Sequence, residues 1–175
     1  MNLGDKAPDF SLQGVDGKTY ALKDFGAASA LVVVFSCNHC PYVQAYEDRM
    51  IALQRDYEAK GARFALINSN EADNYPEDSF ANMAARAQKL GYNFPYLRDE
   101  TQQVARAYNA THTPHLFVFD AQRRLAYTGK IDDNWQDAAA VKQPFLREAL
   151  DDILAGRAPR LAQTQAIGCT IKWKR

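Results

Sequence analysis

Residues 31–40 combine a buried-strand pattern with two closely spaced cysteines, and this stretch constrains the fold more than any other. The run 31–35, Leu-Val-Val-Val-Phe, is β-branched and aromatic, which is typical of a buried strand. Cys37-Asn38-His39-Cys40 follows, and Pro41 then suits the first turn of a helix, where a missing N–H costs little. Because a helix N-terminus favours a thiolate, and thiols this close can form a disulfide, the pattern indicates thiol–disulfide chemistry.

The rest of the chain predicts an α/β fold. A helix from 41 to about 60 separates strand 31–35 from a second apolar strand at 64–68, so these form a parallel βαβ unit. Later strands joined by a tight turn, and a closing helix, imply a mixed sheet covered on both faces. The remaining expected elements are a hairpin of strands 10–12 and 18–22, helix 76–90, strand 94–97, a brief helix ending at 108, strands 115–120 and 124–128, and helix 144–155.

Length and composition narrow the class of protein. With 175 residues we expect one domain, in which 1–30 is an N-terminal hairpin extension and 157–175 is a tail packed on the domain. Lys plus Arg and Asp plus Glu both number 21, so nothing indicates a nucleic-acid or membrane partner. Three cysteines are too few for a secreted disulfide framework, and no leader is evident. The chain is therefore expected to be cytoplasmic.

Motifs along the whole chain carry a family resemblance. The opening Gly4–Leu12, the Cys-Asn-His-Cys-Pro-Tyr motif at 37–42, Thr113-Pro114 and the tail Gly168–Trp173 together resemble the thioredoxin-like superfamily. Within it, the chain is similar to the alkyl hydroperoxide reductase/thiol-specific antioxidant (redoxin) branch, in a subgroup of CNHC-containing thioredoxin family proteins. The resemblance implies a thioredoxin-like fold with a mixed central sheet and helices on both faces.

The resemblance also assigns roles near the cysteines. Cys37 is expected to be the nucleophile, with a lowered pKa at the helix N-terminus, and Cys40 is expected to resolve the mixed disulfide. His39 would tune the pair by stabilising the thiolate, unless it simply faces solvent. Thr113-Pro114 matches the position of the fold's cis-proline, which faces the cysteines while the preceding backbone pairs with an extended substrate.

Three further residues are auxiliary candidates. Glu71 follows the second strand of the βαβ unit, where a buried carboxylate would shuttle the proton of Cys40, although a solvated loop acid is the simpler interpretation. His112 precedes Thr113-Pro114 and is expected near the cysteines. Cys169, in the tail, is interpreted as a second resolving cysteine, a regulatory thiol or a small buried side chain.

These features predict an enzyme, a thiol–disulfide oxidoreductase acting through Cys37 and Cys40 on protein or small-molecule disulfides. It needs a thiol electron donor but no cofactor, because the cysteine pair carries both electrons. The first alternative is a peroxiredoxin-like thiol peroxidase, but the Pro-x-x-x-Thr-x-x-Cys pattern of those enzymes does not align on either cysteine. The second alternative is a zinc or copper carrier, because two cysteines and nearby histidines are a common metal-ligand set.

Overall fold

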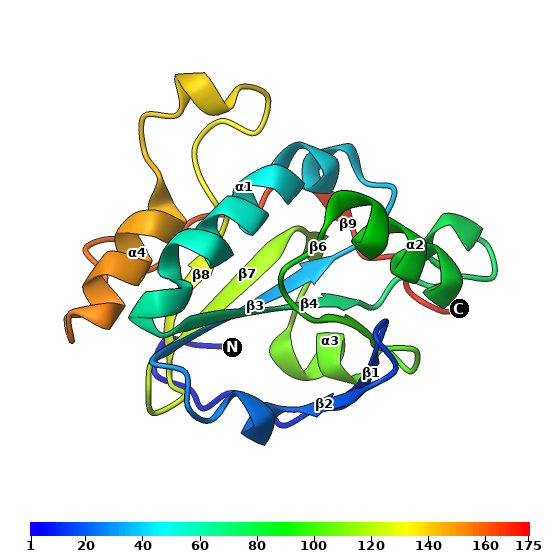
Figure 1. Cartoon of the computed structure of the whole chain (residues 1–175), viewed down its shortest axis with the longest axis horizontal. Helices are drawn as coiled ribbons and strands as arrows, with labels where there is room; N and C mark the ends of the chain where they lie inside the picture. Colours follow the sequence, from blue (N-terminus) through cyan, green and yellow to red (C-terminus); the bar gives the residue numbers. More distant parts are fainter.

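The computed structural model describes all 175 residues and has a seven-stranded sheet at its centre (Figure 1). The strand order is β2-β1-β5-β4-β3-β7-β8, and β6 and β9 form a separate two-stranded ladder. The strands are β1 (Ser11–Gly14), β2 (Thr19–Ala21), β3 (Ala30–Ser36), β4 (Ala62–Asn68), β5 (Tyr96–Arg98), β6 (His112–Thr113), β7 (His115–Phe119), β8 (Leu125–Gly129) and β9 (Cys169–Thr170). The α-helices are α1 (Pro41–Tyr57), α2 (Phe80–Leu90), α3 (Gln103–Tyr108) and α4 (Phe145–Leu154).

The predicted mixed sheet is confirmed. β3 pairs in parallel with β4 along its whole length, and α1 connects them, as the apolar runs indicated. On its other edge β3 pairs antiparallel with β7, which continues antiparallel into β8. Every residue of β3 is buried, which explains why this strand reads as an unbroken apolar run.

The N-terminal hairpin forms as predicted but is not a separate extension. β1 and β2 pair antiparallel around Gly17, whose φ of +84° suits a residue without a Cβ. β1 also pairs antiparallel with β5, so the hairpin becomes one edge of the main sheet. The sequence identified the turn but could not show this second pairing, because β1 and β5 are distant in the chain.

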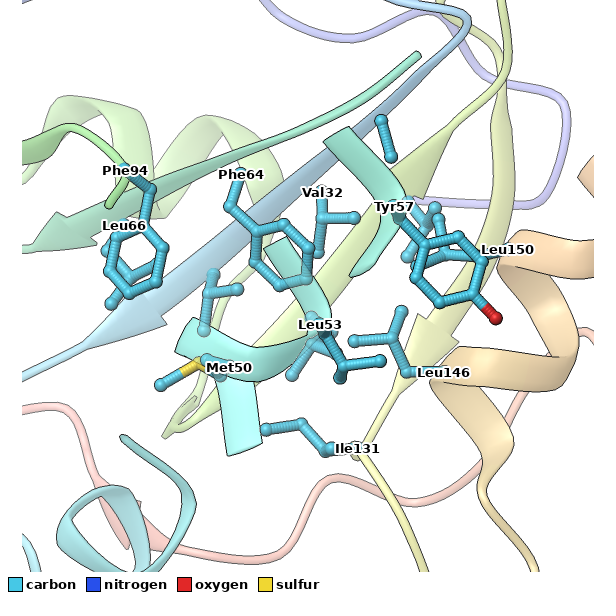
Figure 2. Close-up of a cluster of buried hydrophobic side chains, with 14 of the residues drawn as sticks. Val32, Met50, Leu53, Tyr57, Phe64, Leu66, Phe94, Ile131, Leu146 and Leu150 are labelled. Atoms are coloured by element: carbon cyan, nitrogen blue, oxygen red, sulfur yellow. The ribbon is translucent and has the colours of Figure 1, made fainter. Parts of the chain in front are cut away.

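Alternation along β3 sends side chains into two cores. Val32 and Val34 face a cluster built from α1, α2 and α4, whereas Leu31, Val33 and Phe35 face one built from α3 and the N-terminal segment. In Figure 1 the corresponding helices lie on opposite sides of the sheet. Figure 2 shows part of the first cluster, in which Leu53 and Tyr57 of α1 lie beside Leu146 and Leu150 of α4.

One local prediction differs from the structure, and one segment for which no element was predicted contains a strand. Pro76–Asp78 is a 3₁₀ turn, and α2 begins only after Ser79, whose side chain accepts a hydrogen bond from the Asn82 N–H as an N-cap. The tail, which has no periodicity in the sequence, contains β9 and returns to pair with β6. None of the helices is both long and apolar enough to span a membrane.

Candidate active site

The two motif cysteines lie where β3 meets α1. Cys37 follows the last residue of β3, and Cys40 is the N-cap of α1, with extended backbone angles of φ −72° and ψ 124°. Pro41 then occupies the first turn, as predicted. Both side chains have 0% exposure, and the structure records Cys37, Cys40 and Cys169 as free thiols.

Thr113 lies directly against both thiols. The Cys37 Sγ is 3.4 Å from the Thr113 hydroxyl oxygen, and the Cys40 Sγ is 3.4 Å from the Thr113 carbonyl oxygen. The Thr113–Pro114 peptide bond is cis. The fold therefore brings the expected substrate-binding residues to the cysteine pair, across more than seventy residues of chain.

The tail cysteine joins the pair. β9 places Cys169 opposite Thr113 in an antiparallel pairing, and the Cys169 Sγ lies 2.8 Å from the Cys40 Sγ. Gly168 permits this approach, because a Cβ on it would lie 2.0 Å from the Thr113 carbonyl oxygen. Cys169 is partly exposed, unlike the other two cysteines. Three sulfurs therefore lie together, although sequence patterns alone connect only two of them.

The pKa values of the pair run opposite to the sequence-based expectation. A hydrogen bond from Cys37 stabilises the Cys40 thiolate, and further hydrogen bonds from Cys169 and the Val43 backbone N–H add to it, so the pKa of Cys40 is lowered. The same bond to Cys40, burial and the negative charge of Asp78 raise the pKa of Cys37. The expected lowering at Cys37 is therefore found at Cys40, chiefly because the Cys37 thiol donates to the Cys40 sulfur.

Asp78 is the buried acid of this site, and sequence reasoning missed it. Its carboxylate has 0% exposure and accepts hydrogen bonds from the Asn38 backbone N–H at 2.6 Å and from the side-chain amides of Asn68 at 3.2 Å and Asn70 at 3.0 Å. Its Oδ2 also lies 2.5 Å from the His39 Nδ1. The signal available in the sequence was the pair of asparagines leaving β4 at the edge where the cysteines lie.

His39 is held between two neighbours. Its ring stacks on Tyr75, with centroids 5.9 Å apart and planes 10° from parallel, while its Nδ1 contacts Asp78. One donor atom each from Cys37, His39 and Asp78 lie within 4.8 Å of one another, which is the geometry a bound metal ion would meet. His112 is outside this group, and its Nδ1 is 2.8 Å from the Thr111 hydroxyl instead.

Glu71 is buried, but its carboxylate binds its own loop. The Oε1 atom accepts hydrogen bonds from the backbone N–H groups of Asp73 at 2.6 Å and Asn74 at 3.0 Å. Its own N–H donates to the Lys172 carbonyl at 2.8 Å. Glu71 makes no hydrogen bond to a cysteine, so the contact geometry assigns it to fixing this loop and the tail.

His115 gives the folded protein a predictable pH dependence. Burial lowers its pKa from 6.5 to about 4, and its Nδ1 accepts a hydrogen bond from the Thr111 N–H at 3.2 Å. The unfolded chain binds this proton more tightly, so the contribution is complete above about pH 6.5 and is lost as the pH falls toward 4. We expect His115 to account for about 2 kcal/mol of that loss, measured by urea unfolding at about pH 7 and about pH 4.5. His115→Gln, which does not titrate, should show a smaller loss; an equal loss would contradict the assignment.

The chain is similar to proteins of a known family. Residues 3–128 match the AhpC/TSA family. The thiol-disulfide oxidoreductase ResA of Geobacillus thermodenitrificans is 24% identical over 125 residues, an alignment that covers 70% of this chain but only 66% of that protein, just under two thirds of its length.

Solved structures agree on the fold. A conserved protein of Geobacillus kaustophilus is 45% identical, with a TM-score of 0.94 over 99% of this chain and 93% of that one. A thioredoxin family thiol:disulfide interchange protein of Chlorobium tepidum, 24% identical, has a TM-score of 0.62 over 73% of this chain and 86% of its own, and shows that the fold is thioredoxin-like. With the family match spanning most of its length, the chain belongs to the AhpC/TSA family.

Proposed function

We propose that this protein is a thiol–disulfide oxidoreductase that uses Cys37 and Cys40 on disulfide-containing proteins or small molecules. One observation carries the proposal: the sulfurs of Cys37 and Cys40 both lie against Thr113, each 3.4 Å from one of its oxygens, beside the cis Thr113–Pro114 bond. Relatives named as thiol-disulfide oxidoreductases support the same chemistry. Thiols in general would serve as the electron donor.

The contacts suggest how the pair exchanges electrons. Cys37 attacks one sulfur of the substrate disulfide as its proton passes to the Cys40 thiolate, the form that the lowered pKa of Cys40 favours. The first substrate sulfur leaves as a thiolate and takes that proton from Cys40. Cys40 then attacks Cys37, and the second substrate sulfur leaves as a thiolate that solvent protonates. The substrate gains two electrons, and the protein is left with a Cys37–Cys40 disulfide.

Insulin reduction separates this proposal from the peroxidase alternative. The wild-type protein with dithiothreitol should accelerate insulin precipitation severalfold over dithiothreitol alone, because the pair turns over between the two. Peroxide consumption measured in parallel, with the same donor, should stay at the rate of the donor alone. The proposal fails if peroxide is consumed rapidly while insulin reduction stays at the background rate.

A further inference from the structure

The third thiol of the site has no part in the mechanism above. We propose that Cys169 is a redox-active residue that exchanges with the Cys37–Cys40 disulfide, forming a Cys40–Cys169 disulfide and releasing Cys37 as a thiol. Cys169 gives its proton to solvent and the resulting thiolate attacks the Cys40 sulfur. The Cys37–Cys40 bond breaks, and the departing Cys37 thiolate takes a proton from solvent. No electrons enter or leave in this step. The proposal rests on the proposed function, because it assumes that the Cys37–Cys40 disulfide forms.

Backbone pairing fixes Cys169 against Cys40. Thr113 pairs with Cys169, and His112 pairs with Thr170, while the Ile171 N–H donates to the Thr111 carbonyl at 3.0 Å. This ladder sets the register that brings the two sulfurs to 2.8 Å. The missing Cβ of Gly168 leaves room for the Thr113 carbonyl, so this register requires glycine at that position.

The residues after Cys169 anchor the tail firmly. Ile171 is only 3% exposed and belongs to the core beneath β3. The Lys172 carbonyl accepts hydrogen bonds from the Glu71 N–H at 2.8 Å and the Gln102 side chain at 2.9 Å. Trp173 packs under the Arg106 guanidinium, 4.7 Å from the ring centroid. These contacts keep Cys169 in place, so the exchange needs side-chain rotation rather than movement of the tail.

The exchange would move the disulfide to a more exposed sulfur atom. Cys37 and Cys40 are fully buried, whereas Cys169 reaches the surface. In the Cys40–Cys169 disulfide, the sulfur of Cys169 is therefore the one that an external thiolate can attack. Cys40 then leaves as a thiolate, and hydrogen bonding has already lowered its pKa, which makes it a good leaving group. A second thiol of the reductant reduces the mixed disulfide on Cys169 and is oxidised with the first.

Tryptic mapping of the full chain shows whether Cys40 and Cys169 form the disulfide that the exchange requires. Cleavage after Lys23 and Arg49 leaves Cys37 and Cys40 in one peptide, and cleavage after Arg160 and Lys172 leaves Cys169 in another. The test oxidises the Cys37→Ser variant with diamide, blocks free thiols with N-ethylmaleimide and identifies the peptides by mass spectrometry. We expect the two peptides to be joined by a disulfide within monomeric protein. Unjoined peptides, or dimers linked through Cys40, would overturn the proposal.

Three double variants make the result specific. Cys37→Ser combined with Cys169→Ser should lose the joined peptides, whereas Cys37→Ser combined with Gln165→Ala, an exposed change in the same tail, should keep them. Gly168→Ala in the Cys37→Ser background should reduce the joined fraction about tenfold, because the new Cβ pushes β9 away from Thr113. A joined fraction unaffected by Gly168→Ala would show that the pairing does not control the contact.

The rate at which the oxidised protein is reduced tests the exchange separately from the proposed oxidoreductase function. Oxidised Cys169→Ser should be re-reduced by glutathione about tenfold or more slowly than the oxidised wild type, because this variant cannot form the more exposed Cys40–Cys169 disulfide. Equal rates would overturn the exchange while leaving insulin reduction intact. If instead the wild type reduces no insulin and forms no Cys37–Cys40 disulfide, the proposed function fails and the exchange fails with it.

Discussion

Cys37→Ser is expected to reduce the rate of insulin reduction severalfold, to the background rate of the donor alone. A serine hydroxyl cannot form the mixed disulfide with the substrate, and the remaining Cys40 has Cys169 against it, with 2.8 Å between the two sulfurs. The assay follows insulin precipitation with dithiothreitol as donor, with circular dichroism to confirm that the variant is folded. If Cys37→Ser kept full activity, the assignment of Cys37 as the nucleophile would be wrong.

Cys40→Ser is the matched partner of that variant. It keeps the attacking sulfur but lacks the one that resolves, so a mixed disulfide between Cys37 and a substrate thiol should accumulate. Mass spectrometry after reaction with a disulfide-containing peptide measures the adduct and locates it. An adduct on Cys169 instead would show that the partly exposed thiol is the point of entry in this variant.

Asp78→Asn is expected to destabilise the fold by about 2–4 kcal/mol. One carboxylate oxygen accepts from the Asn38 N–H and the Asn68 amide, and the other accepts from the Asn70 amide and contacts His39. The variant replaces one of these oxygens with an NH₂ group. This group is itself a donor, so it cannot accept the hydrogen bonds that the oxygen accepted in this fully buried site. Urea unfolding measures the change.

The same variant should lower the pKa of Cys37. The charge of Asp78 raises that pKa in the wild type, and asparagine removes the charge. Ultraviolet absorbance of the thiolate, followed against pH in a Cys40→Ser and Cys169→Ser background, reports Cys37 alone. Glu77→Gln removes a neighbouring charge from an exposed side chain and should change stability by less than about 0.5 kcal/mol. If both variants moved the pKa of Cys37 equally, the effect would be general rather than that of the buried carboxylate.

The fold could be predicted because its main signals are local. The apolar run of β3, the helical spacing in α1 and the second apolar run of β4 each depend on neighbouring residues, and together they define a parallel βαβ unit. The pairing of β1 with β5 could not be predicted in the same way. Short edge strands carry little periodicity, and their partners are chosen by packing rather than by sequence pattern.

In the candidate site, too, the residues with a local sequence signal could be predicted and the others could not. Cys37, Cys40 and Thr113 stand out in the sequence because each belongs to a motif, and the structure brings them together. Asp78 does not stand out, because an acid beside Pro76 and Glu77 fits the first turn of a helix equally well. Its role depends on a buried position that only the folded chain creates.

The pairing of β6 with β9 also limits how an outside peptide could bind. A strand added beside Thr113 must replace one that is tethered to the same chain, and a tethered segment competes at an effective concentration in the millimolar range. A free peptide at micromolar concentration would lose that competition unless it bound about a thousandfold more tightly. The chain therefore favours partners that approach through their sulfur atoms over those that dock through an extended backbone.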